Sequence, residues 1–423
     1  MRKIIKNSIN KISPIGFIII ASSTFPIPQK KSIAIEKNTV PSVENTLPEI
    51  PLEISEVPEN QKDSDQYSLT LNPSDNRKLS IIPKIQYNLN NFIKTRRNPI
   101  ATTVLVDVKT GKILAMAQGR HPEKWGATHH TALHPEFPAA SLFKTVVAAT
   151  TFETIDMDYE KPIGLLGSCT EVHPAGRWMQ WNVPGKDSQM TISNAYGHSC
   201  NSFFAKIAID MIGLGNIMHM ASNMGWNGSS IPSDFQIPSS PINPPNPKTS
   251  SAHTVGRFAA GFGYVGISAV HAAWQTLIIA SNGIPKPITI FKDQSSNNIL
   301  KEYDPIISKE TSLKIREIMK TTIQQGTASF AFRYGRYKKI REDIGGKTGT
   351  LTGQNPSGLT SLFVGIYPID NPEVVVSSVV LLDDLWVFKA ANLAAETFAE
   401  YYDYKNQKTP IAKNNNSTTS ITR

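Results

Sequence analysis

Apolar residues recur along this chain at spacings that predict both helices and strands. Between residues 82 and 95 they return every three or four positions and so share one face of a helix; they are Ile85, Leu89, Phe92 and Ile93. Two short apolar runs follow, at 101–108 and 113–117, and the turn between them contains Gly111. Short apolar runs on either side of such a turn predict a β-hairpin.

Later apolar stretches predict a helical middle and a second group of strands. The segment 141–154 is apolar nearly all round, which is typical of a buried helix. Further candidates are helices at 202–213, 266–282, 312–322 and 385–402, a loop or strand at 346–350, and strands at 359–368 and 373–382. This order predicts an α+β fold. We expect an antiparallel β-sheet that joins both ends of the chain and is flanked by helices, plus an all-helical subdomain.

The two ends of the chain differ from this body in composition. Four basic residues among the first eleven precede an apolar stretch at 12–21 and then small residues, the order found in a secretory signal. Residues 1–29 are therefore expected to be a signal peptide or an N-terminal membrane anchor. Residues 30–78 are rich in Pro and acidic side chains, which predicts a flexible spacer. The body covers 79–404, and 405–423 are expected to form a disordered tail.

Composition and charge exclude several classes of protein. Hydrophobic residues make up 40% of the 423 positions, which fits a packed globule rather than a disordered chain or a multi-span membrane protein. The net charge is 43 − 34 = +9, but it is scattered, so no nucleic-acid partner is expected. Two cysteines exclude a Cys-rich fold and a four-thiolate zinc site. We expect neither a metal nor a cofactor.

Three short motifs carry the candidate chemistry, at residues 141–144 (SLFK), 199–201 (SCN) and 347–350 (KTGT). Each is weak alone, since similar patterns recur at 8–11, 74–76, 295–297 and 109–111. The copies in the expected signal, the spacer and the hairpin turn are excluded because these segments do not suit a catalytic site. The three motifs at 141–144, 199–201 and 347–350 follow one another within the body. Lys144 lies one turn beyond Ser141 on the same helix face, where a buried, unpaired lysine is costly unless it is neutral or hydrogen-bonded.

Five stretches around these motifs share a known pattern: VLVDVKTGKILAMAQG, FPAASLFK, GHSCNSFFAKIA, QQGTASFAF and GGKTGTLTG. Together they resemble the transpeptidase domain of penicillin-binding proteins and, more distantly, the serine β-lactamases, over roughly residues 80–402. The glycine-rich stretch GRFAAGFGYVG resembles the cleft-lining loop of that family. The resemblance implies a D,D-transpeptidase that acts on peptidoglycan stem peptides ending in D-Ala-D-Ala and is acylated by β-lactams. No glycosyltransferase region is found, so no polymerising activity is expected.

The resemblance also implies roles for eight residues, of which Ser141, Lys144, Ser199 and Lys347 are expected to be catalytic. Ser141 is the nucleophile, and Lys144 is its base if burial and the charge of Lys347 keep it neutral. Ser199 relays a proton to the departing amine. The backbone N–H groups of Ser141 and Thr350 are expected to form the oxyanion hole. Asn201 is expected to hold the substrate amide, and Lys347, Thr348 and Thr350 to bind the terminal carboxylate. Gly349 is expected to let the strand backbone come close to the substrate.

Rival functions on the same scaffold are a D,D-carboxypeptidase and a serine β-lactamase, in which water attacks the acyl-enzyme. The Glu-x-x-x-Asn pattern of class A β-lactamases has no persuasive match between Ser199 and Lys347, so the acyl-enzyme is expected to be long-lived. A β-lactam sensor would need a transducing domain, which we do not find. We expect a bacterial protein that is exported to the periplasm or the outer face of the cytoplasmic membrane, with possible membrane attachment through its N-terminus.

We interpret the two cysteines, two of the histidines and two of the tryptophans as structural rather than catalytic or metal-binding residues. A disulfide between Cys169 and Cys200 would close a loop of roughly 30 residues and add about 3 to 4 kcal/mol. A free, buried thiol at the middle of such a motif is also ordinary, so the pairing stays open. We expect Trp178 and Trp181 to pack in the core or the cleft wall, and His173 and His198 to be structural because neither has a metal-spaced partner.

Overall fold

The computed structural model describes residues 59, 62, 77–96, 98–120, 130–174, 188–229, 231–293, 303–382 and 387–408. The chain divides into two units, Met1–Thr46 and Leu47–Arg423, and every described residue belongs to the second. The expected signal, most of the spacer, the tail beyond residue 408, Trp178 and Trp181 lie outside the described residues.

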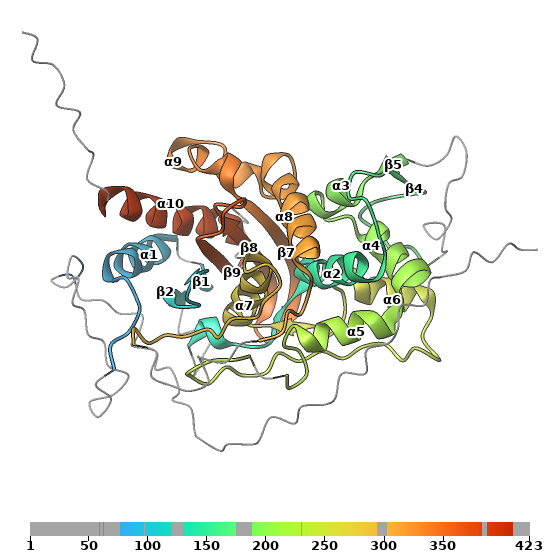
Figure 1. Ribbon diagram of the computed structural model, residues 1–423, viewed down its shortest axis with the longest axis horizontal. Coiled ribbons are helices and arrows are strands. Elements are labelled where there is room, and N and C mark those ends of the chain that lie inside the picture. The colour runs from blue at the N-terminus through green and yellow to red at the C-terminus, as the bar shows by residue number, and fades with distance from the viewer. Residues whose placement is uncertain are drawn as a thin grey trace, which may run out of the picture. The chain divides into compact units, whose positions relative to one another are not determined.

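Five antiparallel strands form the central sheet in the order β2, β1, β9, β8, β7 (Figure 1). Their bounds are Ile100–Asp107 for β1, Ile113–Arg120 for β2, Gly345–Gln354 for β7, Ser357–Tyr367 for β8 and Val374–Leu381 for β9. Because β1 pairs with β9, the early hairpin and the last strand share one sheet. The segment expected to be a loop or strand at 346–350 lies within the edge strand β7.

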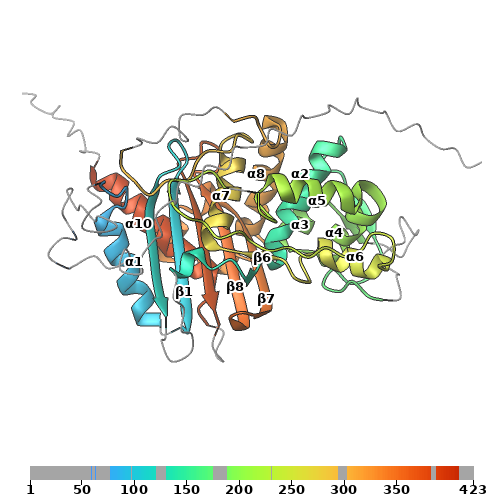
Figure 2. The same ribbon diagram turned by 90° about the horizontal axis from the view of Figure 1, so that it is seen from below.

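Helices cover both faces of this sheet, and the strand sequences explain why. In β1, Val104 and Val106 pack in the core that contains α7 (Ala269–Ala280) and α8 (Lys309–Gln324). The alternate residues Ala101 and Leu105 pack in a second core with α1 (Pro83–Arg96) and α10 (Ala390–Lys408), which lie side by side (Figures 1 and 2). Successive strand residues point to opposite faces, so a strand covered on both sides is apolar at nearly every position.

A mainly helical subdomain, with one short strand pair between α2 and α3, lies beside β7 (Figures 1 and 2). Its elements are η4 (Ala140–Phe143), α2 (Lys144–Thr154), α3 (Ile192–Gly197), α4 (Asn201–Ile207), the π-helix η6 (Ala208–Ile212), α5 (Gly213–Asn223) and α6 (Ala252–Ala259). The continuous helical stretch Asn201–Asn223 is long and apolar enough to cross a membrane, but half of its most apolar window is buried, as in a core helix. The expected α+β fold with an antiparallel sheet, flanking helices and a helical subdomain is confirmed.

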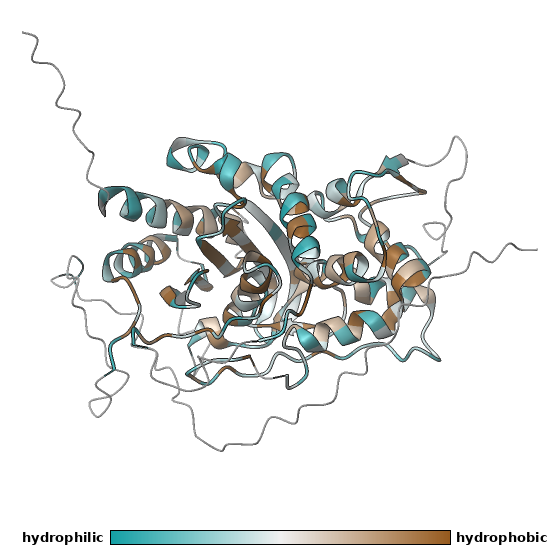
Figure 3. Ribbon diagram, viewed as in Figure 1, coloured by the Kyte–Doolittle hydropathy of each residue, from teal (hydrophilic) through white to brown (hydrophobic). Residues whose placement is uncertain are grey.

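Several element boundaries differ from those expected. The helix expected at 266–282 begins at Ala269, because Gly266–Ile267 pair as β6 with β3 (Phe137–Pro138) and Ser268 caps the helix. The last helix begins at Ala390 rather than 385 and continues to Lys408, into the first residues of the expected tail. The remaining short elements are η3 (Thr131–Leu133), β4 (Ile163–Leu165), β5 (Ser188–Met190), η7 (Ser329–Phe332), α9 (Gly335–Lys338) and η8 (Arg341–Asp343). Hydrophobic residues concentrate in the central strands, whereas α9 and the end of α10 are hydrophilic (Figure 3).

Candidate active site

The three motifs meet in one cleft between the helical subdomain and β7. The cleft has a volume of about 330 Å³ and is lined by Ser141, Ser199, Asn201, Phe262, Thr327, Phe330, Thr348, Thr350, Ser361, Lys389 and Ala391. Ser141 lies in η4 directly before α2, and the SCN residues connect α3 to α4. Lys144 and Lys347 are fully buried. Segments that are far apart in the sequence therefore supply the walls of a single site.

Lys144 makes three short polar contacts from its buried position. Its Nζ lies 2.7 Å from Ser141 Oγ, 2.7 Å from Asn201 Oδ1 and 2.8 Å from the backbone oxygen of Ala260. None of these partners is a carboxylate. Burial, together with the positive charge of Lys347, holds the pKa of Lys144 well below its usual value.

The three contacts of Lys144 suit a neutral amine as well as a charged one. The charged form donates to all three oxygens, whereas a neutral amine has two N–H groups and one lone pair. Asn201 Oδ1 and the Ala260 carbonyl can only accept, so they take the two N–H groups. The lone pair is then left for the Ser141 hydroxyl, which becomes the donor. A lysine in this state can remove the proton from the serine.

Close backbone packing holds the turn that presents Ser141. Ala140, which precedes it, has a φ of +48°, in the left-handed region that is costly for a residue with a Cβ. Gly261 packs against this turn so tightly that a Cβ on it would lie 1.9 Å from the Ala140 oxygen. From β7, Gly349 approaches the same turn, and a Cβ there would lie 3.2 Å from the Ala139 oxygen. The glycines let the neighbouring segments fix this turn.

Ser199 and Lys347 form a second polar pair. Lys347 Nζ donates to Ser199 Oγ and to the backbone oxygen of Thr348, both at 3.0 Å. It also lies 5.3 Å from the centre of the Tyr196 ring. Burial lowers the pKa of Lys347 to about 7. At neutral pH the Ser199 hydroxyl therefore lies beside an amine that can either give or take a proton.

A disulfide holds the SCN segment in place. Cys169 and Cys200 are bonded, so the pairing that the sequence leaves open is present in the structure. The backbone N–H of Asn201 donates to the Cys169 oxygen at 2.7 Å, and Asn201 Nδ2 donates to the Thr170 oxygen at 2.7 Å. Since Asn201 Oδ1 contacts Lys144, both ends of this side-chain amide are fixed.

The cleft also contains six residues that the motifs do not include: Phe262, Thr327, Phe330, Ser361, Lys389 and Ala391. Phe262 belongs to the glycine-rich stretch, and Thr327 and Phe330 belong to QQGTASFAF, so the family resemblance already pointed to their segments. Thr327 Oγ1 is hydrogen-bonded to Thr348 Oγ1 and so joins its loop to β7. Nothing in the sequence around Lys389 indicates a place in the cleft.

Carboxylates and metal ligands are not part of this cleft. None of its lining residues is an Asp or a Glu, and neither His173 nor His198 lines it. Across the part of the chain that the structure describes, no three His, Cys, Asp or Glu side chains gather as metal ligands would. The chemistry available at the site is that of Ser and Thr hydroxyls, lysine amines, the Asn201 amide and backbone N–H groups.

Comparison with known sequences gives a family match. A model described as the penicillin binding protein transpeptidase domain matches residues 101–403. The chain is also similar to the probable peptidoglycan D,D-transpeptidase PbpC of Pseudomonas aeruginosa, with 23% identity over 289 residues. This similarity covers 65% of the chain and 48% of PbpC, so the chain spans about half the length of this relative.

Solved structures share the fold at low sequence identity. A peptidoglycan glycosyltransferase from Burkholderia ambifaria has a TM-score of 0.61 and 21% identity, covering 78% of this chain and 97% of that one. The TP domain of Burkholderia pseudomallei penicillin-binding protein 3 has a TM-score of 0.61 and 22% identity, covering 78% and 96%. Penicillin-binding protein 3 of Mycobacterium tuberculosis, complexed with ampicillin, has a TM-score of 0.60 and 18% identity, covering 80% of each chain.

Proposed function

This chain belongs to the penicillin-binding protein transpeptidase domain family, and from that membership we propose that it is a serine D,D-transpeptidase acting on peptidoglycan stem peptides. The reaction passes through an acyl-enzyme on Ser141. The observation that carries the proposal is the 2.7 Å contact between Ser141 Oγ and a buried Lys144 that has no carboxylate partner and a lowered pKa.

In the acylation step, Ser141 Oγ attacks the carbonyl carbon of the penultimate D-alanine while Lys144 takes the hydroxyl proton. The carbonyl oxygen becomes an oxyanion, which the backbone N–H groups of Ser141 and Thr350 stabilise; one such donor typically contributes about 100-fold or more in rate. The C–N bond then breaks. Ser199 gives its proton to the departing amine and regains one from Lys347, 3.0 Å away. The two lysines together then hold as many protons as before.

The remaining cleft residues orient the substrate. Thr348 and Thr350 lie on the same side of β7 and line the cleft, with Lys347 buried behind them. We assign the terminal carboxylate of the peptide to these two hydroxyls and to the charge of Lys347. Asn201 Nδ2 uses one N–H on the Thr170 oxygen, and its second N–H is available for the substrate amide.

The same cleft favours transfer of the acyl group to an amine over hydrolysis. None of the lining residues is a carboxylate that could activate a water molecule, and a general base typically contributes 10²- to 10⁴-fold. An incoming amine is more nucleophilic than water. Its proton passes through the Ser199 hydroxyl to Lys347, which is neutral after acylation, while Lys144 returns its proton to Ser141 Oγ as the ester bond breaks. We therefore assign transpeptidation, rather than carboxypeptidase or β-lactamase activity, as the main reaction.

Intact-mass measurement with benzylpenicillin tests this function. The parent chain is expected to gain the mass of one drug molecule, to keep it for many minutes after free drug is removed, and to carry it on Ser141 in a peptide map. Ser141→Ala should abolish the adduct, whereas Ser222→Ala, at an exposed position on α5, should not. An adduct on another residue would refute the nucleophile, and loss within seconds with hydrolysed drug accumulating would indicate a β-lactamase.

Peptidoglycan lies outside the cytoplasmic membrane, so we place the protein there as well. The basic, apolar and small residues of positions 1–29 support export with a signal or an anchor. Fractionation of cells that produce the full chain, with antibody detection, tests this location. Recovery in the cytoplasmic fraction alone would refute it.

A further inference from the structure

Lys389 brings an ammonium group to the cleft at a distance from the catalytic lysines. It lies directly before α10, and its backbone is held on both sides, since its N–H donates to Asn392 Oδ1 at 3.0 Å and its oxygen accepts from the Asn392 N–H at 2.9 Å. Its Nζ lies 5.4 Å from the centre of the Phe330 ring, which lines the same cleft. The residue is thus anchored at the backbone and steered by an aromatic face.

Among the described residues, which leave out 383–386, Lys389 has no carboxylate partner. Within the described ranges no Asp or Glu forms an ion pair with it. The first turn of α10 has no acidic residue, and a cation at a helix N-terminus is unfavourable because the helix dipole is positive there. The helix dipole therefore disfavours a cation at Lys389, and a bound anion in the cleft would relieve this cost.

Lys389 lies at the Thr350 end of the residues assigned to the terminal carboxylate, away from Lys347. Lys347 and Thr348 lie toward Ser199 and Thr327. Lys389 lies by Ser361, whose Oγ accepts from the Ala390 N–H at 3.2 Å and which pairs across the sheet with Thr350. Lys347 and Thr350 are three residues apart, roughly 10 Å along a strand. The site therefore has two separate cations along β7, Lys347 toward Ser199 and Lys389 beyond Thr350.

We propose that Lys389 binds a second carboxylate of the acyl donor, one carried on the donor's side chain rather than at its terminus. This subsite rests on the proposed function and extends it, because it assigns a substrate class. Acyl donors with an anionic group between the reacting carbonyl and the rest of the molecule are favoured over neutral ones. Phe330 holds the ammonium in position, and Ser361 fixes the start of α10 that carries it.

Two penicillins that differ by one carboxylate test the subsite. Carbenicillin is benzylpenicillin with an added carboxylate on its side chain, so the ratio of their acylation rate constants reports on that group. The rates are measured by intact mass on the full chain and three variants, Lys389→Gln, Lys389→Arg and Lys338→Gln. The last is the matched control, because it removes one positive charge from an exposed position on α9, outside the cleft. Thermal unfolding is recorded for each variant.

We expect the carbenicillin-to-benzylpenicillin ratio to fall about fivefold in Lys389→Gln, the size of a partly exposed ion pair. The ratio should be kept in Lys389→Arg and in Lys338→Gln, and in the parent it should fall as salt is added. An unchanged ratio in Lys389→Gln overturns the subsite. So does an equal loss for both drugs, which would mean that Lys389 serves the carboxylate they share or the cleft structure. If neither drug acylates the parent chain, the proposed function fails and the subsite fails with it.

Discussion

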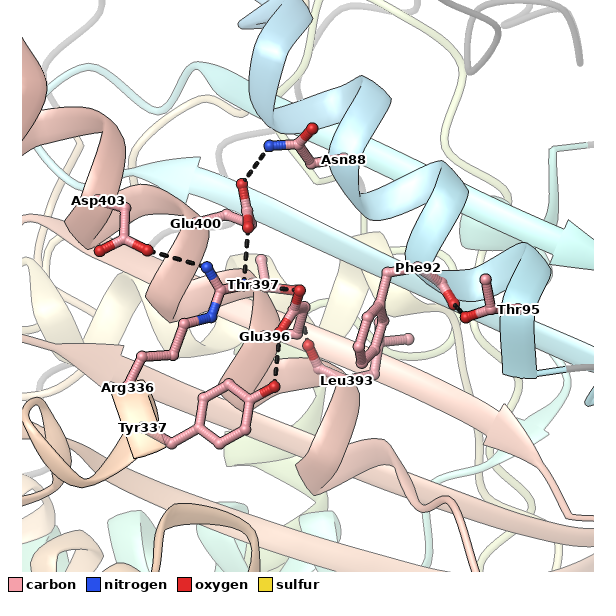
Figure 4. A network of polar contacts seen from close by, with 10 residues as sticks. All are labelled: Asn88, Phe92, Thr95, Arg336, Tyr337, Leu393, Glu396, Thr397, Glu400 and Asp403. Carbon is pink, nitrogen blue, oxygen red and sulfur yellow. Dashed lines mark hydrogen bonds and ion pairs between the residues drawn. The ribbon is translucent and has the colours of Figure 1, made fainter. Parts of the chain in front are cut away.

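Two groups of cations in this domain have opposite surroundings. On the outer face, Arg336 of α9 contacts three carboxylates of α10, at 2.6 Å from Glu396, 2.7 Å from Glu400 and 2.9 Å from Asp403 (Figure 4). Glu400 also accepts a hydrogen bond from Asn88 of α1 at 2.6 Å, so the network joins three helices. This cluster is a structural clamp between elements that are distant in sequence.

Lys144 and Lys347, by contrast, have hydroxyl, amide and backbone oxygens as partners instead of carboxylates. Burial lowers the pKa of both Lys144 and Lys347. Burial alone would also lower the pKa of Arg336, but the hydrogen bonds and charges of Glu396 and Glu400 raise it. The difference teaches that the cation that holds the fold is paired with carboxylates, whereas the two amines that we propose to exchange protons are not.

Removal of the base is expected to have the largest effect. Lys144→Met replaces the amine by an apolar side chain of similar length, so the fold should be kept while acylation by benzylpenicillin falls 10²- to 10⁴-fold. The measurement is the acylation rate by intact mass, alongside thermal unfolding. Lys206→Met is the matched control, because Lys206 is also buried but pairs with Asp210 outside the cleft lining. Similar losses of acylation in both variants would contradict the special role of Lys144.

Addition of a carboxylate to the cleft makes it resemble the Arg336 cluster. Asn201→Asp places a negative charge where Oδ1 now lies, 2.7 Å from Lys144 Nζ. An adjacent opposite charge favours the protonated lysine and raises its pKa, so acylation at pH 7 should fall about 100-fold. Because the neutral amine returns at higher pH, this loss should shrink as the pH is raised. The measurement is the pH–rate profile.

Asn201→Ala is the control for this prediction. It removes the hydrogen bond to Lys144 without adding a charge, so its loss of rate should depend less on pH than that of Asn201→Asp. If the two profiles have the same shape, the charge balance at Lys144 is not what controls acylation.

Disruption of the outer cluster should affect stability and leave the chemistry intact. Arg336→Met leaves Glu396, Glu400 and Asp403 without their cation. Breaking a fully buried pair typically costs about 3 to 5 kcal/mol, but Arg336 is 34% exposed and solvent screens it, so we expect a loss of about 2 kcal/mol in urea unfolding. Arg333→Met, at an exposed position near the same helix, is the control and should cost little. A slower acylation rate in folded Arg336→Met would show that the two clusters are coupled.

The fold follows from the sequence where a local pattern carries the information. Strands such as 374–381 are apolar at nearly every position because helices cover both faces of the sheet, and the amino-acid sequence alone displays this pattern. Helix boundaries do not follow from a local pattern alone, because they depend on partners elsewhere in the chain. Gly266 and Ile267 look like the start of a helix but pair with Phe137 and Pro138.

In the candidate site, too, some residues can be predicted from short motifs, whereas others are brought there only by the tertiary fold. The SLFK, SCN and KTGT residues are contiguous in sequence, and even the low pKa of Lys144 follows from its apolar helix and a second nearby lysine. Lys389 and Ser361 come into the cleft through the stacking of β8 and α10, which no short motif encodes. The disulfide depends on how residues 168–170 meet the SCN segment, and the sequence alone does not specify that contact.

The smallest expected effect is a change in the free energy of unfolding when Lys347 is replaced. Replacement of Lys347 should stabilise the fold, whereas replacement of Arg336 should destabilise it. In the folded chain the pKa of Lys347 is about 7, against an ordinary value of 10.5. Between these two pH values the unfolded chain holds a proton that the folded chain has released. Lys347 therefore lowers the free energy of unfolding at pH 7, and this cost disappears as the pH rises toward 10.5.

Lys347→Met should therefore be more stable than the parent at pH 7, by about 1 kcal/mol once the loss of two hydrogen bonds is subtracted. The advantage should shrink steadily from pH 7 to pH 10, because the methionine does not titrate and the parent gains stability over that range. Urea unfolding of both proteins across this range measures the difference, with Lys338→Met as an exposed control. A variant less stable than the parent at pH 7, or an advantage that grows with pH, would mean that Lys347 is held in its charged form, as Arg336 is.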